Sequence, residues 1–377
     1  MQNNKTPKIF VNLFNPEVKI GILRYVISFF GVIILGSALI IFQNEDPVNA
    51  AKLILEGSFG SMTAIGNTLR WTTPCMLTGA AGIIAFKSGI NNLGIEGQMY
   101  VGALTAAIVG FAVELPPVLH VAACIVMAGI AGVLWVLVPA LMRLFFNINE
   151  YVTTMMMNFV AMLLTDYITL WIIMPGFKET STTIRTPSIL SSAKLPTIIR
   201  GTSASYGFYI ALFICLFVYV LYKYTIKGYE LKQVGDNIKF AKAGGVNTTR
   251  TFISIFVLSG FIAGVCGGIE VTGGYYRYIS NFSSTMGWDG IMIANISGRN
   301  PIALIFVSFV WGMLKTGAMH MERATTLNRL TVNLLQMIFV LLVSINYEGI
   351  INHIKDKWNK RKMKNQMAKA KEGHYVQ

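Results

Sequence analysis

The stretch KSGINNLGIEGQMYVGALTAA, residues 87–107, decides the fold class. Apolar runs flank it at residues 77–86 and 99–113, and between them, among glycines, stand Asn91, Asn92, Glu96 and Gln98. Polar groups beside hydrocarbon are costly unless partners or water satisfy them, and glycine loosens a helix. The stretch therefore predicts a polar break beside or within a bundle of membrane helices. An ordinary short loop between two spans is the alternative.

The composition assigns the whole chain to the membrane. Of its 377 residues, 54% are hydrophobic and 13% are charged, and the mean hydropathy is +0.57. These values are typical of a polytopic membrane protein surrounded by a lipid bilayer. The net charge of +14 would suggest nucleic acid as the partner of a soluble chain. Here the basic loops that membrane proteins keep in the cytoplasm account for it, so we expect no nucleic acid.

The cysteines and histidines indicate neither a metal site nor a cofactor. Cys75, Cys124, Cys215 and Cys266 lie singly in apolar runs, without a CxxC or Cys/His spacing. Such residues are more often buried small hydrophobes than disulfides or metal ligands.

The hydropathy pattern predicts an all-α polytopic fold of about ten transmembrane helices. The run 288–296 is too short to cross alone, and we expect a half-span or part of a broken helix. Residues 50–62 form either an amphipathic surface helix or a plain loop. Small residues recur every four positions at 102, 106 and 110 and at 260, 264 and 268, which predicts close helix packing. The expected spans are 20–42, 71–86, 99–113, 118–141, 152–174, 207–224, 252–269, 288–296, 301–319 and 330–347.

The distribution of Lys and Arg predicts the orientation, because these residues concentrate in cytoplasmic segments. Residues 1–19 then form a cytoplasmic amino-terminal segment and 348–377 a basic cytoplasmic tail, so that both termini lie inside. The transmembrane domain is 20–347. Its two long polar segments fall on opposite sides, 175–206 outside and 223–251 in the cytoplasm.

The sequence contains no motif that would supply the energy for transport. A GxxxxGK[ST] sequence is absent, as is any cluster that resembles a metal site or a hydrolase triad, so we expect no enzymatic activity. Transport would then be passive, driven by an ion gradient, or driven by a separate ATPase. An ion-coupled carrier needs ionisable groups within its spans. The candidates, none with an evident partner in the sequence, are Asp166, Glu270, Lys315 and Asp289.

A separate ATPase needs a docking element, and the segment VGDNIKFAKAGGV, residues 234–246, fits that role. Asn237 can cap a short helix that ends at Gly244 and Gly245, which gives a compact knob for a pocket in a soluble partner. A solvated basic loop that only fixes the orientation is the alternative.

Three blocks of sequence resemble the permease subunits of ATP-binding-cassette importers, in the branched-chain amino acid and simple-sugar superfamily. The resemblance covers residues 20–347 and is closest to nucleoside uptake permeases of the basic membrane protein type. The blocks are TPCMLTGAAGIIAFKSGINNLGIEGQMYVGALTAA from Thr73, INEYVTTMMMNFVA from Ile148 and VGDNIKFAKAGGVNTTRTFISIFVLSGFIAGVCGGIE from Val234.

The resemblance implies a ten-helix permease of the ribose and branched-chain amino acid type in a bacterial cytoplasmic membrane. Its partners would be a second permease, here expected to form a heterodimer, cytoplasmic ATPase subunits, and an external substrate-binding lipoprotein or periplasmic protein. The resemblance also implies an ATPase-coupling segment that contains Gly235, Asn237, Ala241, Gly244 and Gly245. Phe240 and Gly244 stand where relatives often have alanine.

For the substrate we expect a nucleoside, whose hydroxyls and base edges neutral amides can match. The residues expected to shape its path are Asn91, Asn92, Glu96 and Gln98, together with Asn67 and Asn158. A simple-sugar permease of the same architecture is the first alternative. An ion-coupled secondary transporter is the second.

Overall fold

The structure is a computed structural model that describes residues 30–177 and 182–344. The chain divides into two units, Met1–Pro47 with Leu330–Gln377 and Val48–Arg329. The two predicted cytoplasmic tails, 1–19 and 348–377, lie outside the described residues, as do residues 20–29 and 345–347 of the first and last predicted spans.

In the described part of the smaller unit, a helix from Phe30 to Phe42 packs against α15 (Arg329–Ser344). Two glycines of the first helix allow the contact, because a Cβ atom at Gly31 would lie 2.9 Å from Leu342 and one at Gly36 would lie 3.1 Å from Leu335. The order of these contacts shows that the two helices run antiparallel. The predicted spans at 20–42 and 330–347 are therefore helical as far as they are described.

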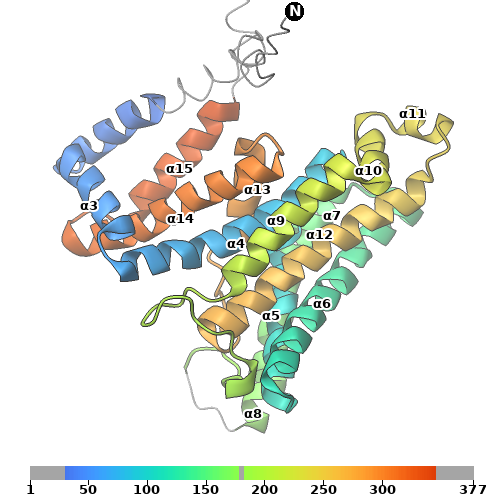
Figure 1. The fold of residues 1–377 in the computed structure, drawn as a ribbon, viewed down its shortest axis with the longest axis horizontal. Coiled ribbons are helices and arrows are strands. Elements are labelled where there is room, and N and C mark those ends of the chain that lie inside the picture. The colour runs from blue at the N-terminus through green and yellow to red at the C-terminus, as the bar shows by residue number, and fades with distance from the viewer. Residues whose placement is uncertain (1–29, 178–181, 345–377) are drawn as a thin grey trace, which may run out of the picture. The chain divides into compact units, whose positions relative to one another are not determined.

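The larger unit consists of helices joined mostly by short turns, with longer non-helical segments at 182–206 and 276–285 (Figure 1). Two isolated β-bridges, Arg185–Ile279 and Thr197–Ser205, connect the 182–206 segment to its surroundings and to itself. The helices are α3 (Pro47–Phe59), α4 (Met62–Lys87), α5 (Ile95–Ala112), α6 (Pro117–Phe146), α7 (Glu150–Ile168), α8 (Met174–Gly176), α9 (Gly207–Tyr224), α10 (Ile226–Asp236), α11 (Ile238–Ala243), α12 (Thr248–Glu270), α13 (Met286–Ile296) and α14 (Pro301–Ala324). Single π-helical turns, Thr169–Ile173 and Val271–Tyr275, extend α7 and α12.

Six helical stretches of the described residues are long and apolar enough to cross a membrane: Ile95–Ala112, Pro117–Phe146, Glu150–Gly176, Gly207–Tyr224, Thr248–Tyr275 and Pro301–Ala324. The all-α polytopic fold that the sequence predicts is thus observed, with fewer spans by this measure than the ten expected. The helix α4 is long enough, since its 26 residues extend about 39 Å at the usual rise. It is too polar to be counted, and neighbouring helices bury most of it.

The centre of the larger unit is the contact of α5, α6 and α12, and its closeness depends on glycine. A Cβ atom at Gly102 would lie 2.7 Å from the Cα of Gly264, and one at Gly132 would lie 2.3 Å from the carbonyl oxygen of Gly260. The predicted close packing along both rows of small residues is confirmed. Gly110 is the exception, because it contacts Ile189 of the 182–206 segment and not another helix.

Several predicted boundaries were wrong. The helix α4 begins at Met62 rather than at 71, because Ser61 caps it by accepting a hydrogen bond from the Ala64 N–H at 3.0 Å. Asn67 and Arg70 therefore lie in a helix and not in a loop. Likewise α5 begins at Ile95, so that the polar break is confined to residues 88–94. The polar segment 223–251 contains two helices, α10 and α11, and the choice left open at 50–62 is resolved by the helix α3.

The helix α13 has 11 residues, about 16 Å, roughly half of the hydrocarbon thickness of a bilayer. It follows the second half of α4 in the same direction. A Cβ atom at Gly290 would meet Thr78 at 2.2 Å, and one at Gly82 would meet Ala294 at 3.2 Å. The helix thus begins beside the middle of α4 and ends near Lys87, as expected for a half-span.

The two long polar segments lie at opposite ends of the larger unit. Figure 1 shows α10 and α11 at one end and α8 at the other. The 182–206 segment covers the α8 end through backbone hydrogen bonds. Leu190 N–H donates to the Gly110 carbonyl at 2.8 Å, and Leu195 N–H donates to the Thr272 carbonyl at 2.9 Å.

Candidate functional site

A cavity of about 850 Å³ opens among α3, α4, α14 and Ser203 of the 182–206 segment. Its volume lies within the range usual for sites of small molecules. Amide, hydroxyl, charged and aromatic groups all line it, so it can accept a polar ligand that also has a flat apolar face. The lining residues are Glu56, Gly57, Gly60, Ser61, Thr63, Ala64, Asn67, Arg70, Trp71, Ser203, Thr316, Met319, His320 and Arg323.

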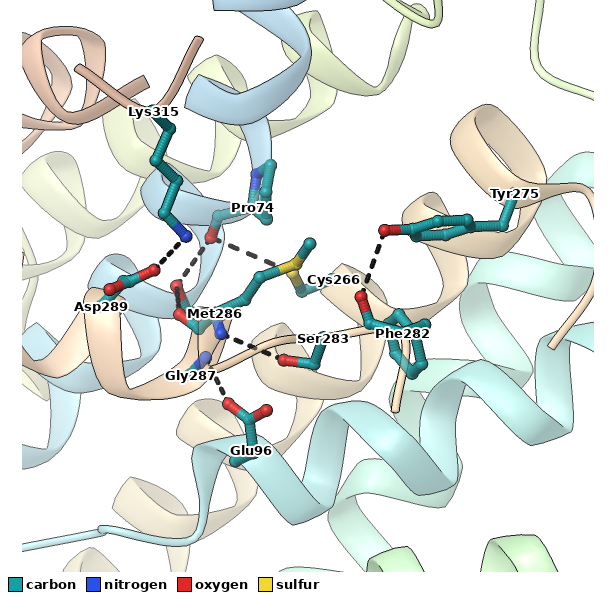
Figure 2. A network of polar contacts seen from close by, with 11 residues as sticks. Pro74, Glu96, Cys266, Tyr275, Phe282, Ser283, Met286, Gly287, Asp289 and Lys315 are labelled. Atoms are coloured by element: carbon teal, nitrogen blue, oxygen red, sulfur yellow. Dashed lines mark hydrogen bonds and ion pairs between the residues drawn. The ribbon is translucent and has the colours of Figure 1, made fainter. Parts of the chain in front are cut away.

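Two buried ion pairs lie beside this cavity. Arg70 of α4 pairs with Glu270 of α12 at 2.6 Å, and the two side chains are 11% and 5% exposed. Lys315 of α14 pairs with Asp289 of α13 (Figure 2), and this pair is nearly as buried. Charged side chains inside a bundle of membrane helices are usually paired with one another. The two pairs connect four different helices at one place.

Trp71 joins the two pairs into one cluster. The Arg70 guanidinium lies 4.3 Å from the centre of the Trp71 ring, and the Lys315 ammonium lies 5.0 Å from it. Both distances are suitable for a cation–π interaction. We call Arg70, Trp71, Glu270, Asp289 and Lys315 the charged cluster. Because Arg70 and Trp71 also line the cavity, the cluster forms part of its wall.

The sequence identified three members of the charged cluster as ionisable candidates, Glu270, Asp289 and Lys315, but paired none of them. Arg70 was missed because it was assigned to a loop. A prediction that started α4 earlier would have counted Arg70 among the residues of the spans. Two basic residues, Arg70 and Lys315, would then have balanced two acidic ones, Glu270 and Asp289. The fourth candidate, Asp166, lies elsewhere and accepts hydrogen bonds from Tyr278 Oη at 3.0 Å and Ser280 Oγ at 2.7 Å.

Glu96 connects the beginnings of two helices. It lies in the first turn of α5 and is buried, and its Oε2 accepts a hydrogen bond from the backbone N–H of Gly287, in the first turn of α13, at 2.5 Å (Figure 2). The Met286 N–H donates to Ser283 Oγ at 3.0 Å beside it. These bonds satisfy N–H groups that the start of a helix leaves without partners.

Asn92 and Gln98 form a buried pair of amides. Asn92 Nδ2 donates to Gln98 Oε1 at 3.2 Å, and Gln98 Nε2 donates to Asn92 Oδ1 at 3.0 Å. Asn92 also donates to Ser259 Oγ at 2.9 Å, which ties the break to α12. The structure thus brings together two of the predicted site residues, Asn92 of the polar break and Gln98 of the first turn of α5.

Asn158 of α7 supports the same break. Its Oδ1 accepts from the Gly97 N–H at 2.8 Å, and its Nδ2 donates to the Leu93 carbonyl at 2.8 Å. Asn91 is half-buried and does not join these bonds. Asn67 lies apart from the others, in the cavity.

The expected docking segment has the predicted local geometry. Asn237 caps α11 by accepting from the Phe240 N–H at 3.1 Å, and the helix ends before Gly245, whose φ is +84°. Ile238 and Phe240 are 61% and 64% exposed, so α11 presents apolar side chains to its surroundings. Ala241 is buried on the other face.

Gly235 holds this segment against the polar break. A Cβ atom there would lie 2.6 Å from the Ser88 carbonyl carbon, and one at Gly89 would lie 2.7 Å from the Gly235 Cα. A cavity of about 600 Å³ that both Gly89 and Asn237 line lies at this contact. A movement of α10 and α11 would therefore reach the loop that precedes α5.

The described residues contain no group of three or more side chains that could hold a metal ion. The four cysteines are buried and free.

These features define a multi-pass α-helical membrane protein with a polar cavity at one end and a short exposed helix at the other. The chain belongs to the family of branched-chain amino acid transport system permease components, which matches residues 64–343. It is thus a membrane permease subunit of an ABC transporter, in the cytoplasmic membrane, and members of the family work with an ATPase and a substrate-binding protein.

Similar proteins include the guanosine ABC transporter permease NupP of Bacillus subtilis, 27% identical over 83% of this chain and 90% of the relative. The nucleoside ABC transporter permease NupB of Lactococcus lactis is 25% identical over 84% of this chain and 85% of its own length. The glucose ABC transporter permease TsgB13 of Haloferax volcanii is 24% identical over 84% and 86%. No solved structure matches the chain.

Proposed function

We propose that this chain is the permease of an ATP-driven importer of nucleosides. The observation that carries the proposal is its family membership, together with two bacterial relatives, named for guanosine and for nucleosides, that match over most of both chains. The cavity supports it, since Asn67 and Thr316 offer groups for hydroxyls and base edges and Trp71 offers a flat ring. A sugar permease is the second candidate, because the glucose permease also matches.

We infer that the α10 and α11 end faces the cytoplasm, because the basic residues concentrate there and in the two tails. The domain bounds of 1–19, 20–347 and 348–377 then stand as proposed, with both termini inside. Ten crossings would comprise the six apolar stretches together with α4, α15, the helix Phe30–Phe42, and α13 with the loop that leads into it. The cavity and the 175–206 segment then face outward, toward the substrate-binding protein.

The translocation path in this proposal begins in the cavity and passes the charged cluster along α4. Asn67 would contact the substrate directly. Asn91 and Asn92 of the polar break, with Glu96 and Gln98 of the first turn of α5, would shape the path by setting where α5 and α13 begin. Asn158 would hold them in place. Their hydrogen bonds support this role, since an amide pair inside the bundle fixes the break.

The coupling segment would transmit the movement of the ATPase. Asn237, Ala241, Gly244 and Gly245 shape the exposed turn of α11, and Gly235 connects it to the loop before α5. We infer a heterodimer with a second permease. Purification of the assembly followed by mass spectrometry of its subunits tests this, and a complex with two copies of this chain and no other permease would exclude it.

Uptake of radiolabelled solutes tests the proposed function. Cells that express the complete assembly should accumulate guanosine and uridine, and neither ribose nor glucose should compete. Accumulation of glucose alone would establish the sugar permease instead. In vesicles that contain only this chain, a proton or sodium gradient should produce no concentrative uptake, and such uptake would identify an ion-coupled carrier.

A variant tests the polar break. Asn92→Leu should reduce uptake while the protein reaches the membrane in normal amount, because Gln98 and Ser259 lose the amide that connects them. Unchanged transport would remove the break from the path.

A further inference from the structure

A second pocket, of about 500 Å³, lies at the α10 end of the larger unit and is distinct from the cavity described above. It lies between the last residues of α4 and α9, one face of α10 and the turn before α14. Its lining contains four basic side chains and one acidic side chain, which leaves a strong excess of positive charge. The lining residues are Lys87, Tyr219, Tyr222, Lys223, Lys232, Asp236, Gly298, Arg299, Asn300 and Pro301.

Neutral groups hold three of these cations in place. The Lys87 ammonium lies 4.8 Å from the centre of the Tyr222 ring, Arg299 Nη1 donates to the Phe86 carbonyl at 3.0 Å, and Lys223 Nζ donates to Tyr219 Oη at 2.5 Å. Tyr222 is fixed in turn, because its hydroxyl donates to the Ile84 carbonyl at 2.9 Å. These contacts position three of the four basic side chains at the wall of the pocket.

The positive charges disfavour one another in the absence of an anion. Lys87 follows the last apolar residue of α4 and is half-buried, so water solvates its ammonium less than it would an exposed lysine. The amino-terminal end of α14, at Asn300 and Pro301, adds the positive end of a helix dipole. A bound anion would relieve this repulsion.

The surface beside the pocket is apolar. The helices α9 and α14, which both contribute to the pocket lining, pack against each other, and both expose large apolar side chains. These are Phe217, Val220 and Tyr224 on α9 and Ile302, Phe306 and Val310 on α14. Basic groups with tyrosines next to an exposed apolar helix surface are typical of the boundary between headgroups and acyl chains.

We propose that this pocket binds the phosphate headgroup of an anionic phospholipid, whose acyl chains lie along α9 and α14. A lipid is favoured over a soluble anion because α9 and α14 both line the basic pocket and expose apolar side chains. It also favours a lipid over the ATPase, because the apolar side chains proposed to meet that subunit, Ile238 and Phe240, lie on α11 and do not line the pocket. The inference does not depend on which solute is transported.

The test measures lipid binding to the full chain in its assembled complex, purified in a neutral detergent. Fluorescent phosphatidylglycerol is titrated against fluorescent phosphatidylcholine with the same acyl chains. We expect phosphatidylglycerol to bind more tightly by at least tenfold. Lys87→Gln and Lys232→Gln should each weaken it about fivefold, the effect of one basic group near a membrane surface. Lys87→Arg should retain binding.

The matched control is Lys227→Gln, which removes a basic side chain of α10 outside the pocket, where it pairs with Glu230. It should leave binding unchanged. Equal binding of the two lipids would overturn the proposal, as would an equal loss in the Lys227 variant. Displacement by millimolar inorganic phosphate would identify a site for free anions. Loss of the ATPase from the Lys87 and Lys232 variants with normal lipid binding would assign the pocket to the ATPase.

Discussion

The Glu96 carboxylate and the Gly287 N–H, 2.5 Å apart, join the first turns of α5 and α13 inside the larger unit. This contact shows that α5 and α13 start at about the same depth. Since α13 begins beside the middle of α4, both helices start within the bundle. The positive ends of both helix dipoles lie near this one acid. Helices that begin within a bundle are a known way for a transporter to place polar groups at mid-membrane, and here a side chain of the protein occupies that place.

Glu96→Gln should preserve this contact, since its amide oxygen can still accept the hydrogen bond from Gly287. Glu96→Leu removes the acceptor and leaves a buried N–H without a partner, which costs about 1–3 kcal/mol. We therefore expect thermal unfolding in detergent at a lower temperature for the Leu variant, together with reduced uptake. If the Gln variant loses as much transport as the Leu variant at normal stability, the charge itself takes part in transport.

The Arg70–Glu270 pair should show the behaviour of a buried ion pair. Glu270→Met alone leaves the Arg70 guanidinium uncompensated, at a cost of about 3–5 kcal/mol, whereas Arg70→Met with Glu270→Met removes both charges. The single variant should unfold at a lower temperature, and the double variant should recover most of that loss. Thermal unfolding of the purified proteins measures both effects.

Uptake by the double variant then separates structure from transport. If the charged cluster contacts the substrate, stability should return without transport. Full recovery of both would limit the ion pair to holding α4 against α12.

Trp71 should affect the apparent affinity for the solute more than its maximal rate. Trp71→Leu removes the ring that the cavity offers for stacking and that holds Arg70 and Lys315, so we expect KM for uptake to rise about tenfold, equivalent to roughly 1.4 kcal/mol. Trp135→Leu is the matched control, because Trp135 of α6 does not line the cavity and donates only to the Met157 carbonyl, at 3.3 Å. Similar changes in KM for the two variants would count against a role of Trp71 in binding.

The sequence predicted what is local in the structure. Asn237 and Gly245 lie at the two ends of a short helix, so their chemistry alone indicates the turn of α11. The row that contains Gly260 and Gly264 likewise predicts close packing without naming the partner. The charged cluster could not be predicted from local sequence. Arg70 and Glu270 are 200 positions apart, and only the packing of α4 on α12 brings them together. Hydropathy also placed the start of α4 too late, at residue 71 instead of Met62. Hydropathy alone cannot show that neighbouring helices bury a polar helix.

The exposed turn of α11 offers a prediction with a close internal control. Gly245 and Gly201 share a positive φ, +84° and +80°, and a Cβ atom at either would meet nothing within 4 Å. A substitution at either position therefore brings the same kind of backbone strain, and its Cβ atom meets no close neighbour. The two glycines differ in place, since Gly245 follows α11 and Gly201 belongs to the segment at the opposite end.

We expect Gly245→Trp to insert normally into the membrane and to lose its ATPase on purification, because the indole would stand on the surface where α11 is proposed to dock. Gly201→Trp should keep the ATPase. Co-purification of the tagged permease with its ATPase measures the difference. Normal retention of the ATPase by the Gly245 variant would move the docking site away from α11, and loss in both variants would show that strain at a glycine, not position, disrupts the complex.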